Sequence, residues 1–488
     1  MKKKILAKII ALIILCALAC SLTSCIKILY GMVGTIDILE FVEVEGGYAV
    51  KGAIDSGEST GDFITKSLSY LKTLSENMIL EIPSEHNGKP VVAIADEAFK
   101  FYVFLNQVII PDTVKVIGES AFEGCILLMK CDIPESVTEI QRRAFIGCMT
   151  LKKIEIPDGV ISIGEEAFVD AMSFSMGDYS KVPDILTKRI KFDLSEVCST
   201  VKISKTVENI GSKAFGAMAM ATEFEVDSEN QYFSSVDGIL CSKDGTKLIQ
   251  YPAGKADESF TIPDSIAEIG PWAFHKNTNL KTLIIPNHIE KIGGSAFRYT
   301  SSDLILDFGE VDPSFEIIDG ILYSSDGRDL VMCFNDTVEF EFVVPDSVVN
   351  IGEGAFYGCE NLLKLTFGEN SKLEIVGDEA FYNCASIENI DFPKTIKSIG
   401  NRALANCEKL KSCGIYGSDV ELGTMLWKWS WNLQGIYYGG DAYQFARYLN
   451  KEIPNYEIFP VCMINCSNGY ISCSSSGCTV LPVSTQSE

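Results

Sequence analysis

The sequence is poor in the residues that most often carry acid–base and metal chemistry. Only three histidines occur among 488 residues, at His86, His275 and His288. It contains no His-Glu-x-x-His pair, no phosphate-cradling glycine loop and no nucleophile elbow. We therefore expect no catalytic residues, no metal site and no cofactor, and we expect that the protein is not an enzyme.

Basic residues are few relative to acidic ones. The chain has 41 lysines and arginines and 66 aspartates and glutamates, which gives a formal net charge of −25. Such a surface repels the phosphate backbone of nucleic acids, so we expect no nucleic-acid partner. Apolar residues make up 47% of the chain, which excludes an intrinsically disordered protein and indicates an ordered core.

Long apolar runs are absent after the first 22 residues. Lysines at positions 2–4 precede an apolar stretch at 5–22, and Leu22-Thr23-Ser24-Cys25 then resembles a bacterial lipobox. This order predicts a signal peptide at 1–24, lipidation of Cys25 and a tether at 25–35. The protein would then be exported and anchored by lipid at the cell surface, with no other membrane contact. An uncleaved anchor helix, or cleavage without lipid, is the alternative.

A repeat of 23 residues runs through most of the chain. The dipeptide Ala-Phe or its Ala-Leu variant occurs in ten related copies, at Ala98-Phe99, Ala121-Phe122, Ala144-Phe145, Ala167-Phe168, Ala214-Phe215, Ala273-Phe274, Ala296-Phe297, Ala355-Phe356, Ala380-Phe381 and Ala403-Leu404. Apolar residues also precede a proline at fixed distances, as Leu151, Ile154 and Ile156 precede Pro157. The alternation predicts a short strand with one buried face, which the proline ends. One copy has too little apolar surface to fold alone, so the copies must stack on a shared core.

The consensus Ile-Pro-x-x-Val/Ile-x-x-Ile-Gly-x-x-Ala-Phe-x-x-Cys resembles the BspA-like, or Treponema-type, leucine-rich repeat. Residues 133–148 and 344–359 match it closely, although Gln141 replaces the glycine in the first. We predict a repeat solenoid over 81–412, mainly β with short turns or helical segments and about ten units. The resemblance implies a curved array with a parallel sheet on one face. It also implies a surface protein that contacts molecules of a host or a neighbouring cell.

Insertions interrupt the period at three places. The spacing from Phe215 to Phe274, and again from Phe297 to Phe356, is one repeat plus 36 residues. These insertions, at about 219–258 and 301–340, share Asp-Gly pairs flanked by apolar runs, which predict tight β-hairpins projecting from the solenoid. They either contact a partner or form a larger repeat variant that only lengthens the sheet. For the third, about 169–204, we expect a loop with one irregular strand.

The sequence predicts a cap at each end of the repeat array. Residues 36–80 alternate in polarity around Gly46-Gly47 and predict an N-terminal β cap. At 413–460 we predict a C-terminal cap, whose final part at 435–449 resembles the strand and helix that close BspA-like arrays. Trp427, Trp429 and Trp431 alternate there, which would place them on one face of a strand. They would then either pack against the last repeat or offer a platform to a glycan.

The 17 cysteines fall into recognisable groups. Five occupy the position three residues after the repeat's Phe or its Leu substitute: Cys125, Cys148, Cys359, Cys384 and Cys407. We interpret them as a ladder of small, buried, reduced side chains, with disulfides between neighbouring copies as the alternative. The Cys/Ser-rich tail at 461–488, which we expect to be mobile, holds Cys462, Cys466, Cys473 and Cys478. Their spacing fits two local disulfides or free thiols better than zinc.

The strand residues between core positions should face solvent and could bind a partner. These are Gln107, Ile109, Lys130, Asp132, Lys153, Glu155, Thr282, Ile284, Lys364, Thr366, Asn389 and Asp391. We expect the partner to be an extracellular or cell-surface protein, bound in adhesion or another protein–protein interaction. A glycan-binding lipoprotein and an envelope scaffold without a foreign ligand are the alternatives.

Overall fold

Each copy of the repeat folds into one turn of a solenoid. In a representative copy, β10 (Ile154–Ile156) is a longer strand, Pro157 ends it, and β11 (Ser162–Ile163) is a two-residue strand. The turn that follows carries Ala167-Phe168. Longer strands pair in parallel with longer strands of the next copy, and two-residue strands pair with two-residue strands. The predicted β solenoid with parallel sheets is confirmed.

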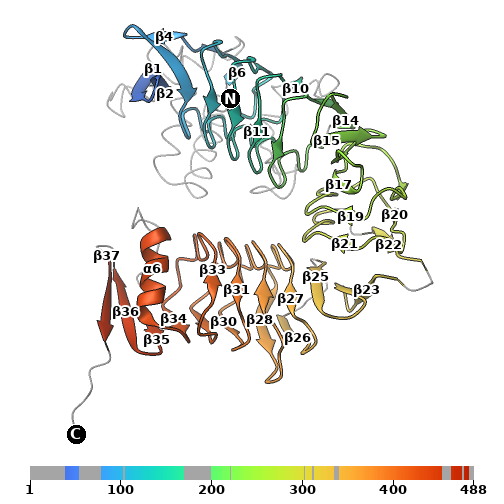
Figure 1. Ribbon diagram of the computed structural model, residues 1–488, viewed down its shortest axis with the longest axis vertical. Coiled ribbons are helices and arrows are strands. Elements are labelled where there is room, and N and C mark those ends of the chain that lie inside the picture. Colours follow the sequence, from blue (N-terminus) through green and yellow to red (C-terminus); the bar gives the residue numbers. More distant parts are fainter. Residues whose placement is uncertain are drawn as a thin grey trace, which may run out of the picture. The chain divides into compact units, whose positions relative to one another are not determined.

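The computed structural model describes most of the chain (Figure 1). The described residues are 39–53, 78–102, 105–169, 199–219, 221–301, 303–309, 313–334, 340–452, 463–474 and 477–482. The predicted signal peptide, Cys25 and the tether lie outside them, as does most of the third insertion. The chain divides into two compact units, the first made of residues 1–260, 272–282 and 299–305, the second of 261–271, 283–298 and 306–488.

The first unit begins with an antiparallel hairpin of β1 (Leu39–Val44) and β2 (Gly47–Ala53), which turns at the predicted glycines. β2 then pairs in parallel with β5 (Lys89–Ile94), which β4 (Glu85–His86) flanks. The two-residue strands continue this sheet as β7 (Val116–Ile117), β9 (Glu139–Ile140), β11 and β13 (Asn209–Ile210). The longer strands form two sheets, one of β3 (Met78–Glu81), β6 (Leu105–Ile109) and β8 (Lys130–Asp132), the other of β10, β12 (Thr200–Ile203) and β14 (Glu223–Val226).

Residues 259–307 alternate between the two units. They contain β18 (Ser259–Thr261), β19 (Glu268–Ile269), β20 (Thr282–Ile284), β21 (Lys291–Ile292) and β22 (Ile305–Asp307).

In the second unit the two-residue strands are β27 (Asn350–Ile351), β29 (Ile375–Val376), β31 (Ser398–Ile399) and β33 (Glu421–Leu422). The longer strands are β26 (Phe340–Val344) paired with β28 (Leu362–Phe367), followed by a six-stranded sheet. That sheet consists of β30 (Asn389–Phe392), β32 (Ser412–Ile415), β34 (Gly435–Tyr438), β35 (Met463–Cys466), β36 (Gly469–Ser474) and β37 (Gly477–Pro482).

The repeated phenylalanines form the centre of the core. In the first unit the rings of Phe99, Phe122, Phe145, Phe168 and Phe215 stack in sequence, with centroids 5.2 to 5.5 Å apart. The alanine beside each phenylalanine is buried, which lets neighbouring turns approach closely. Each copy therefore completes the hydrophobic surface of the next.

The cysteine ladder lies beside these rings. The Cys125 thiol donates to the carbonyl of Phe99 at 3.2 Å, and Cys407 makes the same contact with Phe381. All five ladder cysteines are buried and free, so the reduced ladder is confirmed and the disulfide alternative is not. Burial raises the pKa of the Cys407 thiol to about 12, so this thiol stays protonated at neutral pH and is a poor nucleophile.

Both predicted hairpins form. In the first, β15 (Phe233–Val236), β16 (Ile239–Ser242) and β17 (Lys247–Gln250) run antiparallel. In the second, β23 (Phe315–Ile318), β24 (Ile321–Ser324) and β25 (Asp329–Cys333) do the same. Asp237 and Gly238 both have positive φ, of 52° and 76°, as a type I′ turn requires.

The second hairpin does not project from the solenoid. β25 pairs in parallel with β27 and so extends the sheet of two-residue strands. Its residues Leu330, Val331, Met332 and Cys333 are all buried, which a free hairpin could not achieve. The expected projection is therefore wrong here, and the larger repeat variant that lengthens the sheet is the correct interpretation.

The strand expected to be irregular in the third insertion is regular. β12 pairs in parallel with β10 and β14, and its Val201 and Ile203 are buried. It belongs to the repeat that carries Ala214-Phe215.

The period continues past residue 412, where we expected it to stop. Trp427 lies 23 residues after Leu404 and occupies the position of the repeat's phenylalanine. Ser430 replaces the ladder cysteine, and its hydroxyl donates to the Leu404 carbonyl at 2.8 Å. Residues 424–429 are a turn, so the strand expected to carry Trp427, Trp429 and Trp431 is not formed.

One helix, α6 (Ala442–Glu452), covers this eleventh copy. The Asp441 carboxylate caps its N-terminus by accepting from the Tyr443 backbone N–H at 2.7 Å. Phe445 and Leu449 are buried, and the Phe445 ring lies 6.2 Å from that of Trp427. Among the helices that the structure describes, none has the length and hydropathy to cross a membrane.

The tail is structured where the structure describes it. β35, β36 and β37 extend the six-stranded sheet, so the expectation of a mobile tail is wrong for residues 463–474 and 477–482. β35 pairs with β34, β36 with β35 and β37 with β36, which supplies the backbone hydrogen bonds that a mobile tail would lack. The register places Cys473 opposite Cys478, while Cys462 lies outside the described residues. The choice between disulfides and free thiols stays a prediction.

Candidate functional site

The side chains predicted to bind a partner are accessible to solvent. Eight are exposed, namely Ile109, Lys130, Asp132, Lys153, Glu155, Lys364, Asn389 and Asp391. Gln107, Thr282, Ile284 and Thr366 are half-buried. Alternate residues such as Val108 and Ile390 point into the core instead. The predicted exposure is confirmed, and binding stays a prediction.

In the first unit this strand face carries opposite charges that pair. The register aligns Glu155 with Lys202 and Lys202 with Glu225 across three parallel strands. Lys202 Nζ lies 3.3 Å from Glu225, and Lys153 Nζ lies 2.6 Å from Glu155. Lys130 and Asp132 form a similar pair at 3.5 Å. Because each of these carboxylates lies close to a lysine, this part of the strand face carries both signs of charge without a dominant one.

In the second unit the strand face is polar and aromatic. One row of the register runs from Asp391 through Gly414, Tyr437 and Asn465 to Tyr470. In the adjacent row the Ser412 hydroxyl donates to Asn389 Oδ1 at 2.6 Å. Asn389 and Asp391 are among the residues predicted from the sequence, whereas these tyrosines are not. The continued period at Trp427 was the signal that could have placed them.

The three tryptophans do not form the platform considered for a glycan. Trp427 is 2% exposed against α6, whereas Trp431 is 59% exposed. Trp429 lies in the turn with φ of 66° and has the Lys428 ammonium 4.6 Å from its ring centroid. The rings therefore share no common face, and Trp427 acts as part of the cap.

A second group of polar side chains lies in the turns. It includes residues that directly precede Ala-Phe in the repeat. These residues adopt a left-handed conformation, with φ of 59° at Arg143, 55° at Glu166 and 58° at Lys213. Non-glycine residues seldom adopt it, because their Cβ crowds the backbone. The repeated conformation gives the side chains at this position a common direction, except in the copy where Gly354 has none.

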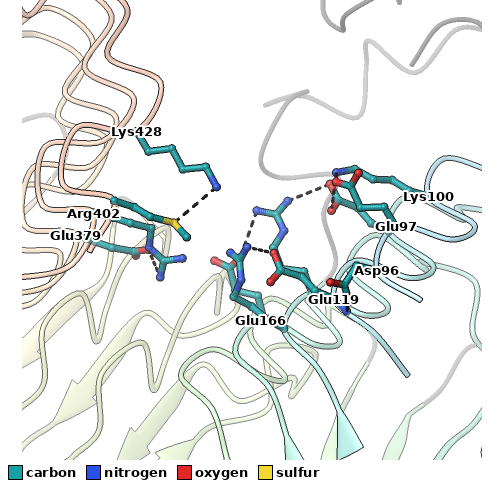
Figure 2. A network of polar contacts seen from close by, with 12 residues as sticks. Asp96, Glu97, Lys100, Glu119, Glu166, Glu379, Arg402 and Lys428 are labelled. Atoms are coloured by element: carbon teal, nitrogen blue, oxygen red, sulfur yellow. Dashed lines mark hydrogen bonds and ion pairs between the residues drawn. The ribbon is translucent and has the colours of Figure 1, made fainter. Parts of the chain in front are cut away.

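In the first unit, side chains at this position and charged side chains that directly follow the repeat's phenylalanine form a chain of ion pairs (Figure 2). Glu123 lies 3.5 Å from Lys100 and 3.2 Å from Arg143, and Glu166 lies 3.6 Å from Arg143. Glu166 also lies 3.5 Å from Lys213, whose side chain is 1% exposed. The Lys213 ammonium sits 3.7 Å from the Trp272 ring centroid. Signs alternate along the chain, so each buried charge has an opposite neighbour.

The second unit has its own, shorter set, of which Figure 2 labels Glu379 and Arg402. Arg402 and Glu379 pair at 2.9 Å, and Asn406 donates to Asn383 at 2.7 Å. In both sets the opposite charges come from turns of successive copies. These contacts join neighbouring copies of the repeat within each unit.

The model of the family described as "BspA type Leucine rich repeat region" matches residues 92–218, 255–311 and 332–455, with six copies. These segments make up more than half of the 488 residues. The chain belongs to the BspA-type leucine-rich repeat family. No curated protein matches it.

This BspA-type chain is also similar to solved structures. One is a leucine-rich repeat protein from Bacteroides ovatus, with 22% identity over 83% of this chain and 94% of that chain, and a TM-score of 0.33. Another, from Eubacterium ventriosum, has 17% identity over 82% and 88%, with a TM-score of 0.38. A leucine rich cell surface protein from Faecalibacterium prausnitzii has 21% identity over 84% and 95%, with a TM-score of 0.30. Because these TM-scores are low, the assignment to the family rests on the family match alone.

Proposed function

We propose that this BspA-type protein is an exported lipoprotein whose solenoid binds an extracellular or cell-surface protein and catalyses no reaction. Lipid at Cys25 would attach it to the membrane. The observation that carries the proposal is the strand face, where exposed polar and aromatic side chains stand in rows on parallel strands. Backbone pairing fixes those rows before any partner arrives, so binding orders little of the chain.

The strand face suits a partner that makes many modest contacts. A stable protein interface buries about 1,200–2,000 Å² in total, which requires side chains from several neighbouring copies. The rows supply them at a spacing of roughly 4.8 Å from strand to strand. The net charge of −25 favours a basic partner and an association rate that falls as salt rises.

A crosslinking capture on intact cells tests the proposal. The full chain is compared with a variant carrying Lys153→Glu, Glu155→Lys and Asp391→Lys. We expect the variant to capture its protein partner at least about tenfold less, because three strand-face charges are reversed. A control carrying Lys397→Glu, Glu374→Lys and Glu421→Lys makes the same change in net charge on and beside the two-residue strands, and we expect normal capture.

Two results would count against this function. Equal capture by the strand-face variant and its control would remove the strand face as the binding surface. Recovery of proteins from the producing cell's own envelope alone would favour a scaffold without a foreign ligand.

Substitution of Cys25 tests the anchor separately. In the producing cells, the wild-type chain should sediment with membranes, and Cys25→Ser should leave them for the soluble exported fraction, because the thiol that accepts the lipid is gone. Cys466→Ser is the matched control, since it removes a thiol far from the signal, and it should stay with membranes. If Cys25→Ser also stays there, an uncleaved anchor helix holds the chain.

A further inference from the structure

Four residues of the second unit form a cluster on the strand face, here called the Asp391 cluster: Asp391, Gly414, Tyr416 and Tyr437. The parallel register of β30, β32 and β34 places Asp391 beside Gly414 and Gly414 beside Tyr437. Tyr416 directly follows β32. Figure 1 labels β30 and β34 in the second unit, with β35, β36 and β37 following them.

The glycine makes the cluster possible. A Cβ at position 414 would overlap the Asp391 carboxylate and lie 2.9 Å from the ring of Tyr416. The Asp391 carboxylate and the edge of the Tyr416 ring therefore both lie close to the Gly414 backbone, in space that a larger side chain would fill. The Tyr416 and Tyr437 rings lie 4.9 Å apart at an angle of 35°, and these residues are 40% and 41% exposed. A carboxylate thus lies beside two accessible aromatic rings.

The charge of Asp391 is not neutralised by a neighbour. Asp132, Glu155 and Glu225, on the strand face of the first unit, each pair with a lysine. Among the residues that the structure describes, none forms an ion pair with Asp391. The negative charge of this carboxylate also raises the pKa of the nearby Tyr416 phenol. The register row from Asp391 to Tyr470 contains no lysine or arginine.

We propose that the Asp391 cluster binds an arginine or lysine side chain of the protein partner. The carboxylate would pair with the cation, and the tyrosine rings would attract it through their electron-rich faces. A planar guanidinium suits both contacts, because it can stack on a ring and donate two hydrogen bonds to a carboxylate. The inference rests on the proposed function and names the partner's chemistry at one site. A neutral oligosaccharide could stack on the rings and donate hydroxyl hydrogen bonds to the carboxylate, but it would gain no attraction between opposite charges.

A short peptide isolates this contact. The probe is acetyl-Gly-Arg-Gly-Arg-Gly-amide, and its control replaces arginine by citrulline, which keeps the shape and removes the charge. Binding to the immobilised full chain is measured at low and at physiological ionic strength. We expect the arginine peptide to bind more tightly, and Asp391→Asn or Tyr437→Ala to weaken it about fivefold each. Asp132→Asn, which removes a lysine-paired carboxylate of the first unit, should leave it within about twofold.

Three outcomes would overturn the inference. The first is equal binding of the arginine and citrulline peptides, and the second is equal loss in Asp391→Asn and Asp132→Asn. The third is binding of cellohexaose that Tyr437→Ala abolishes, with no binding of the arginine peptide, which would make the cluster a saccharide site. If any of these occurs while the strand-face variant still loses capture on cells, the proposed function stands and only this site is wrong.

Discussion

Glu166→Gln should lower the unfolding free energy by about 3–5 kcal/mol, the cost of breaking a buried ion pair by removing one partner. The substitution keeps the size of the side chain and removes its charge. The Lys213 ammonium, 3.5 Å from Glu166 and with its side chain 1% exposed, would then lose its carboxylate within a region that water does not reach. The Trp272 ring would remain, but a ring face attracts a cation less strongly than a carboxylate does. Urea denaturation followed by circular dichroism measures the change.

Two variants separate this explanation from a general sensitivity to mutation. Glu258→Gln breaks an ion pair with Lys281 whose side chains are both more than 60% exposed, and it should change the midpoint very little. Adding Lys213→Met to Glu166→Gln removes the stranded charge while keeping most of the volume, and it should restore much of the lost stability. A double variant as unstable as Glu166→Gln would show that the charge is not the cause.

Phe145→Ala should cost about 3–5 kcal/mol by the usual penalty for emptying a buried aromatic site. Phe145 is 2% exposed and stacks between Phe122 and Phe168, with centroids 5.3 and 5.2 Å away. The cavity would lie between two copies, so both neighbours would lose contacts. We expect a lower urea midpoint together with new proteolytic cleavage near residues 120–170.

Phe145→Leu is the matched control, because the chain itself uses Leu404 at this position in the tenth copy and buries it completely. It should lose less than half as much stability as Phe145→Ala. Similar losses in both variants would mean that ring stacking, rather than filled volume, holds the copies together.

The repeat fold could be predicted because its signal is periodic and apolar. Between the insertions most Ala-Phe pairs recur every 23 residues, and burial of those side chains requires the copies to stack on one another. The same spacing could have predicted that Trp427 belongs to a further copy, because it lies 23 residues after Leu404. The alternation of the three tryptophans has a period of two residues, which wrongly predicted a strand. The longer period, set by packing against the previous turn, decides the structure.

The charged chain could not be predicted in this way. The residue before Ala-Phe is Ser120, Arg143, Glu166 and Lys213 in successive copies of the first unit, so no single residue type repeats. Glu166 and Lys213 are also 47 residues apart, because an insertion separates copies that are adjacent in space. Only part of the Asp391 cluster could be predicted from the sequence, because its residues come from different copies. Asp391 follows the strand pattern, but its tyrosine neighbours become neighbours only through the register of β32 and β34.

The left-handed turn position also limits how this array could have lengthened during evolution. Tandem duplication places a new copy next to its parent, so that identical residues come to lie one above the other. For Glu166 or Lys213 this would bring like charges together in a turn with little access to water, which is unfavourable. Ser120, which carries no charge, could be duplicated without that penalty. Copies around residues 143–213 are therefore fitted to their particular neighbours, and gene-level shuffling of them should be tolerated less well than loss or gain of copies elsewhere.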